Sequence, residues 1–168
     1  MNETNFPEIE FEGDDFEFAS IEEELRVDER CQSLLICFYK HLQNLGHTPQ
    51  DASRLAYGAD YYLRNYLLDF ARQNVVRPKP GIVSYFAANW FITHTLSPEP
   101  AVLDQHLEAV LEFYRFLHQQ HFISMDELAF IEEEASRSIY FHQRIENFLA
   151  IVGDGFFSWD AECPITFR

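Results

Sequence analysis

The sequence predicts an all-α protein, folded as a compact bundle of about five helices. Apolar residues recur at steps of three and four positions through most of the chain, which is the period of a helix face. Capping residues precede these stretches, and prolines or glycines separate them. The chain has 168 residues, 47% of them hydrophobic, which is enough for one globular domain with a sizeable core.

The first two helices are expected on either side of Gly46, a residue type that commonly follows a helix C-terminus. The first begins near Val27, and its apolar residues keep a helical period: Cys31, Leu34, Leu35, Phe38, Leu42 and Leu45. Thr48 then supplies an N-cap and Pro49 the first helical position of a second helix. Gly58 could bend that second helix, which we expect to run to about Phe70.

A proline-rich link separates the second helix from the third. Pro78 and Pro80 lack a backbone donor and restrict the residues before them, so no helix continues through residues 75–81. Residues 82–95 are apolar on nearly every face. A helix that is apolar all round is typical of a protein interior. We therefore expect this helix at the centre of the bundle.

Two more helices are expected, and they complete a helical domain over residues 27–152. The fourth helix begins after Ser97 and ends near His121. Ser124 and Glu127 form a capping box for the fifth helix, which we expect to continue to residue 152. Its predicted inward stripe is Leu128, Ile131, Ala135, Ile139, His142, Ile145, Leu149 and Val152. The remaining segment, residues 153–168, is too apolar for a free tail and is expected to pack on the bundle or on a partner.

The acidity of the chain is concentrated at its N-terminus. The formal net charge is -16, and residues 1–30 carry 12 acidic and two basic residues. Within an acidic tail over residues 1–26, apolar residues alternate with glutamates: Phe6, Ile9, Phe11, Phe16 and Phe18. Such a pattern fits a short hairpin or a flexible, loosely docked segment, and we favour the second. Either the bundle or a partner must cover these rings, and we expect a partner to do so.

Sequence motifs give little support to an enzyme. The dinucleotide, P-loop, hydrolase-elbow and zincin motifs are absent, and we expect no cofactor. Three histidines, His118, His121 and His142, could bind zinc, although a helix-end and core role is favoured. Cys37 and His41 are interpreted as a buried thiol beside a surface histidine. The consecutive glutamates 132–134 point about 100° apart on a helix, so we interpret them as a solvated face.

Targeting signals and the number of cysteines indicate the cellular compartment in which the protein is expected. The N-terminus has neither a positively charged start nor an unbroken apolar stretch, and no segment is apolar enough to span a bilayer. Three cysteines without paired spacing argue against a secreted disulfide framework. We therefore expect a soluble, cytoplasmic protein with no membrane partner.

One stretch resembles a known family. Five features follow one another along this stretch: a capped start at Thr48, an aromatic-rich helix, a break before residues 82–86, a new helix from Ser97, and a closing stretch over residues 113–124. This order resembles the helical N-terminal core-binding (SAM-like) domain of tyrosine recombinases and phage integrases. The resemblance implies a DNA-contacting or partner-contacting helical module, without the family's separate catalytic domain. Three clustered basic residues are the candidates for phosphate contact: Arg72, Arg77 and Lys79.

The function expected from the sequence is a non-enzymatic protein–protein interaction module with an acidic-aromatic docking tail. One alternative is a nucleic-acid-related protein, either a degenerate core-binding module or an acidic competitor of DNA. A bundle with an enzymatic or ligand-binding site assembled from scattered residues is another. The net charge of -16 disfavours nonspecific attraction to nucleic acid.

Overall fold

The computed structural model describes residues 9–163. Within that range every element of regular structure is a helix, which confirms the all-α prediction. The elements follow in this order: η1 (Gly13–Phe16), α1 (Ile21–Asn44), α2 (Pro49–Asp60), η2 (Tyr61–Ala71), α3 (Ile82–Tyr85), η3 (Phe86–Trp90), α4 (Phe91–Thr93), α5 (Pro100–Gln119), α6 (Met125–Ala135), α7 (Ser138–Leu149) and α8 (Phe156–Ala161).

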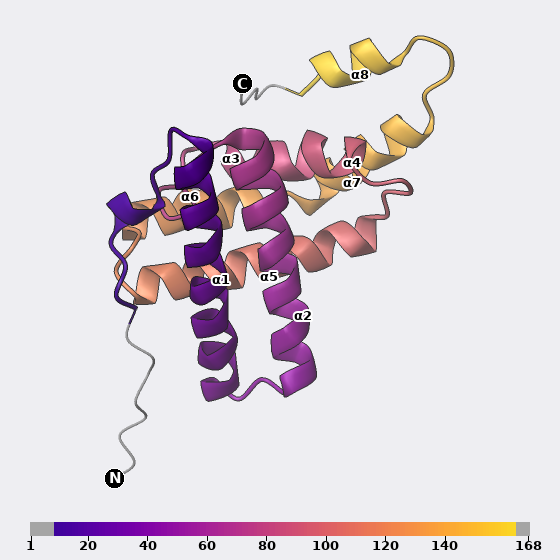
Figure 1. Ribbon diagram of the computed structural model, residues 1–168. Coiled ribbons are helices and arrows are strands. Elements are labelled where there is room, and N and C mark those ends of the chain that lie inside the picture. Colours follow the sequence, from indigo (N-terminus) through magenta and orange to yellow (C-terminus); the bar gives the residue numbers. More distant parts are fainter. Residues whose placement is uncertain (1–8, 164–168) are drawn as a thin grey trace.

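Two layers of helices make up the bundle (Figure 1). Helices α1 and α2 lie side by side, and both pack on α5, which crosses behind them. Helix α5 in turn contacts α6 and α7. The core lies between these layers and is rich in aromatic side chains, including the buried rings of Phe38, Tyr62, Phe86, Phe113 and Tyr114.

Helix α1 begins earlier than predicted, at Ile21 instead of near Val27. Ser20 is its N-cap, and the Ser20 side chain accepts a hydrogen bond from the backbone N–H of Glu23. Three glutamates in the first turn then stabilise the helix, because their negative charges lie at the positive end of the helix dipole. The sequence prediction assigned this acidic run to the tail, whereas its acidity stabilises the start of a helix.

Helix α2 begins as predicted. Thr48 is the N-cap and accepts from the backbone N–H of Asp51, with Pro49 at the first helical position. The helix continues as the π-helical η2 to Ala71. Gly58 has a packing role, because a Cβ there would lie 2.6 Å from the Cβ of Ala109. The small residue therefore lets α2 approach α5 closely.

The apolar stretch after the prolines is helical from Ile82 to Thr93, and every residue from 82 to 92 is buried. Its start has no cap of its own, since Gly81 carries no side chain. Glu134 of α6 fills this role: its carboxylate accepts from the backbone N–H groups of Gly81 and Ser84, at 3.0 and 2.9 Å. The predicted solvated face is therefore wrong for Glu134, which is 6% exposed. A buried helix start needs an acceptor, and α6 supplies it.

The single helix predicted over residues 125–152 is two helices, α6 and α7. Arg137 leaves the helical conformation, with φ -82° and ψ 44°, and the Ser136 hydroxyl donates to the Glu133 carbonyl oxygen. This break shifts the helical phase, so that Phe141, Arg144 and Ile145 face the core. Three residues of the predicted inward stripe are instead exposed: Ile139, Leu149 and Val152.

Helix α8 is tied to α7 through Arg144 and Trp159. Arg144 donates to the carbonyl oxygens of Ala88 and Trp159, at 3.0 and 2.6 Å, and its guanidinium lies 3.8 Å from the Trp159 ring centroid. The Trp159 indole N–H donates back to the Arg144 carbonyl oxygen at 2.9 Å. The C-terminal segment thus packs on the bundle at Trp159, while Phe157 is 78% exposed. Residues 164–168 lie outside the described part of the chain.

Candidate functional site

The N-terminal segment, defined as residues 9–20, lies against the bundle. Phe16 is fully buried, and its ring meets that of Phe122 edge-on with centroids 6.1 Å apart. Three other members of the predicted docking set are partly buried against the same core: Ile9, Phe11 and Phe18. The bundle therefore covers rings that we expected a partner to cover. Phe6 lies outside the described residues.

Acidic residues of the segment pair with one of the predicted phosphate-contacting residues. The guanidinium of Arg77 lies 2.6 Å from a carboxylate oxygen of Asp14 and 3.0 Å from one of Glu17. All three side chains are largely exposed, so each pair contributes little to stability. Asn74 adds hydrogen bonds to the Gly13 carbonyl oxygen and to Glu17.

The other two basic residues of that set lie at the same end of the molecule. Arg72 pairs with Glu24 at 3.1 Å, and its guanidinium lies over the Phe18 ring, 5.1 Å from the centroid. Lys79 is exposed and forms no ion pair within the described range. The structure therefore places two of the three candidates in contact with acidic side chains of their own chain.

A second surface, which the sequence analysis did not single out, is the groove between α1 and the continuous helix of α2 and η2. Two hollows of about 470 and 480 Å³ follow one another along this seam and share Arg64 as a lining residue. We call it the α1–α2 groove. Large apolar side chains line it in exposed positions: Ile21 (77%), Leu25 (61%), Ile36 (56%) and Tyr57 (71%). Exposed apolar side chains gathered in one groove are typical of a surface that binds a partner.

Ion pairs divide this groove at its middle. Arg64 of η2 lies 2.7 Å from a carboxylate oxygen of Asp60 and 3.7 Å from one of Asp28 on α1. Farther along, Asp69 lines the groove and has no ion-pair partner among residues 9–163. The lining residues comprise four acidic side chains, the fourth being Glu24, and one basic side chain. The groove therefore combines exposed apolar side chains with an acidic border.

A signal for this groove is present in the sequence. Leu25 and Ile36 are separated by about three helical turns, which places them on one face of a helix. This face differs from the stripe that packs inward through Leu34 and Phe38. The bundle buries only one face of α1, so apolar residues on a second face indicate a surface that another element can cover. This second set of apolar residues was not recognised from the sequence.

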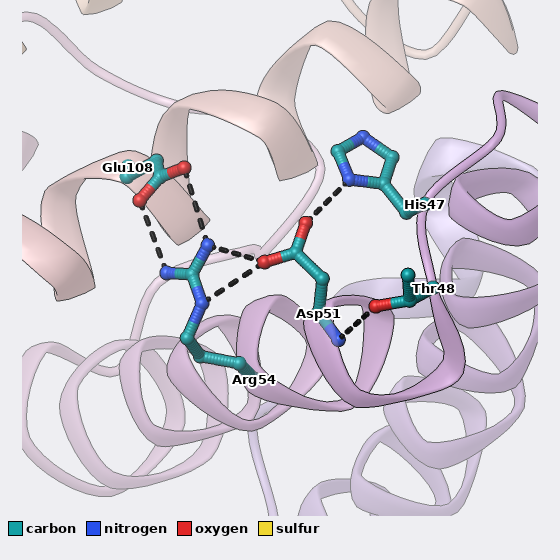
Figure 2. A network of polar contacts seen from close by, with 5 residues as sticks. All are labelled: His47, Thr48, Asp51, Arg54 and Glu108. Carbon is teal, nitrogen blue, oxygen red and sulfur yellow. Dashed lines mark hydrogen bonds and ion pairs between the residues drawn. The ribbon is translucent and has the colours of Figure 1, made fainter.

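An exposed polar network ties the start of α2 to α5 (Figure 2). Asp51 lies between His47, at 2.6 Å, and Arg54, at 2.7 Å, and Arg54 also pairs with Glu108 at 3.0 Å. The hydrogen bonds from His47 and then Arg54 hold the pKa of the Asp51 carboxyl below its ordinary value. The hydroxyl oxygen of Thr48 is occupied as the helix cap. Within the described range, no nucleophilic side chain is hydrogen-bonded to His47, so this network positions helices.

The three histidines considered as zinc ligands do not converge. His142 pairs with Asp104 at 2.7 Å, and the ring of His118 lies 3.2 Å from the Ile123 carbonyl oxygen. His121 follows α5 in a left-handed conformation with φ 64°. Between residues 9 and 163 no group of three or more His, Cys, Asp or Glu side chains could hold a metal ion. The hypothesis of a zinc site from these three residues is therefore wrong.

Cys37 and His41 do not form an activated pair. His41 is buried, with its ring 5.1 Å from that of Phe116 on α5, so the expectation of a surface histidine is wrong. Burial lowers the pKa of His41 and raises the pKa of the half-buried Cys37 thiol. Both shifts favour the neutral forms, whereas a nucleophilic cysteine needs a thiolate.

Comparison of the chain with protein-family models, with curated proteins and with solved structures gives no match. The resemblance to the core-binding domain of tyrosine recombinases therefore stays a prediction. None of the helices described here is both long and apolar enough to span a bilayer.

Proposed function

We propose that the protein is a non-enzymatic interaction module that binds a protein partner through the α1–α2 groove. The observation that carries this proposal is the exposure of Ile36 and Tyr57, 56% and 71%, on opposite walls of one hollow. Covering such side chains removes apolar surface from water, which is the main favourable term in protein association. The groove thus takes the docking role that the sequence analysis gave to the acidic-aromatic tail.

The alternative of a DNA-contacting module depends on the basic residues near the proline link. Arg72 and Arg77 already pair with acidic side chains, and phosphate would have to displace these. Affinity for DNA comes largely from basic side chains that neutralise phosphates and so release the counterions bound to the DNA. Binding of a protein partner is therefore the function that these contacts support best.

Affinity capture from cell extract with matched variants tests the proposal. The groove variant combines Ile36→Ser with Tyr57→Ser. The control combines Ile139→Ser with Leu149→Ser, two residues of α7 that are similarly exposed, at 83% and 62%. We expect the groove variant to lose the proteins captured by the full chain and the control to keep them, with the melting temperature unchanged in both. Equal capture by the groove variant and the full chain would contradict the proposal.

A further inference from the structure

The two hollows of the α1–α2 groove have a spacing that limits what can occupy them. Leu25 lines one hollow and Ile36 the other, and both lie on one face of α1. At the rise of a helix their separation along the axis is about 16 Å, or roughly three turns. An occupant that fills both hollows therefore presents two apolar anchors about three helical turns apart.

The walls of the groove favour a helix as that occupant. Helices α1 and α2 lie side by side (Figure 1). Exposed apolar side chains from both helices line the two hollows between them. A third helix packs into such a seam by placing a row of its side chains between the rows of the other two. Recognition of an amphipathic helix by an apolar groove is a recurring mode that uses anchors at helical spacing.

Charge decides between a partner and a second copy of the chain. The lining residues have a formal charge of -3, from four acidic side chains and Arg64, and Arg72 beside the groove offsets Glu24. A second copy would bring the same acidic border and a net charge of -16 against it. Basic side chains beside the anchors would instead meet Asp69 and its acidic neighbours.

The geometry points to an amphipathic helix with basic flanks, belonging to a protein partner, as the occupant of the α1–α2 groove. This inference rests on the proposed function and names the class of partner. The two apolar anchors of that helix match the spacing of Leu25 and Ile36 and enter the hollows beside them. Between the anchors the helix carries small residues, because the ion pairs of Arg64 with Asp28 and Asp60 divide the groove there.

Three designed peptides test this inference by fluorescence anisotropy with the full chain. The basic probe is a helical peptide with leucine anchors about three turns apart, small residues between them and lysine flanks. The acidic probe has glutamate in place of each lysine. The shifted probe keeps the lysines but has its anchors about two and a half turns apart, on opposite faces of the helix. We expect the basic probe to bind about tenfold more tightly than either of the others and to weaken as salt rises.

Variants of the chain locate the binding. Asp69→Asn is expected to weaken the basic probe about twofold to fivefold, because it removes an acidic charge from the border of the groove. Glu146→Gln, which changes an exposed residue of α7, is the control and is expected to leave binding unchanged. Leu25→Ser is expected to weaken the basic probe further still, through loss of the wall of one hollow.

Three outcomes would overturn the inference. Equal affinity for all three peptides would show that neither the charge nor the anchor spacing selects the occupant. A concentration-dependent dimer in sedimentation, abolished by the groove variant, would make a second copy the occupant. If the groove variant loses its captured proteins while the basic probe does not bind, the proposed function stands and the inference about the partner's chemistry fails.

Discussion

The N-terminal segment and the α1–α2 groove carry the same kind of side chain, yet the bundle covers one and leaves the other exposed. Phe16 is fully buried, whereas Tyr57 is 71% exposed. In the sequence the segment looked like the exposed element, because its rings alternate with glutamates, and α1 looked like an ordinary amphipathic helix. An alternating pattern shows that one side of a segment needs cover, but the tertiary structure decides whether the chain itself provides it.

The largest effect expected from this comparison is the loss of stability in Phe16→Ala. Truncation of a fully buried phenylalanine costs about 3–5 kcal/mol in the free energy of unfolding. The matched substitution in the groove, Ile36→Ser, removes a side chain that is 56% exposed and is expected to change stability by about 0.5 kcal/mol or less. Urea unfolding of both variants measures the difference. Similar losses of unfolding free energy in the two variants would show that the bundle buries the two regions to the same extent.

A smaller loss is expected from Gly58→Ala, which tests what holds the groove in shape. The new methyl group would meet the Cβ of Ala109 at 2.6 Å, so α2 or α5 has to move. Overpacking of this kind costs about 1–3 kcal/mol, partly offset by the higher helix propensity of alanine. We expect the second substitution Ala109→Gly to restore part of this loss in a double-mutant cycle. Additive effects of the two substitutions would contradict the close approach of the helices.

Removal of charge from the N-terminal segment is expected to have a smaller effect still. The double substitution of Asp14→Asn and Glu17→Gln removes both ion pairs of Arg77, and these are exposed. We expect the free energy of unfolding to change little, and far less than in Phe16→Ala, because exposed pairs contribute little. A loss as large as that of Phe16→Ala would show that charges, rather than the buried ring, hold the segment on the bundle.

The same double variant tests the DNA alternative. We expect the full chain to give no mobility shift with duplex DNA at physiological salt, because its net charge is -16. A shift that appears in the double variant alone would show that the N-terminal segment competes with phosphate for Arg77. A shift with the unmodified chain would restore a nucleic-acid function.

A pH dependence is expected from the histidines between α5 and the helices of the groove. Burial lowers the pKa of His41 and His106 below the ordinary 6.5, so the folded state favours their neutral forms. Their contribution to stability is complete above pH 6.5 and is lost as the pH falls below that value, since the unfolded chain then binds more protons. His106→Gln is expected to reduce this slope. An unchanged slope in His106→Gln would exclude His106 as a source.

Local signals in the sequence predicted much of the fold. Thr48 and Ser124 cap helices as predicted, because a cap depends on residues within one turn. The break at Ser136 and Arg137 was missed, since no proline or glycine marks it. Glu134 was misassigned because its carboxylate accepts hydrogen bonds from backbone groups that are distant in the sequence, at Gly81 and Ser84.

The candidate site was predictable only in part. The docking residues of the tail were identified as needing cover, but the surface that receives Phe16 includes Phe122, which is distant in sequence. The groove needs two helices, and only its α1 wall leaves a periodic signal, at Leu25 and Ile36. Tyr57 on the opposite wall became a candidate once the packing of α1 against α2 was known.

The most direct test of the comparison is hydroxyl-radical footprinting of the full chain, alone and with the basic probe. We expect rapid oxidation of Tyr57 and Ile36 in the free chain, slow oxidation of Phe16, and protection of Tyr57 and Ile36 when the probe is added. Rapid oxidation of Phe16 and Phe18 in the free chain, with protection there and none at Tyr57 on addition of the probe, would contradict the account. It would make the N-terminal segment the docking element and leave the α1–α2 groove without a role in binding.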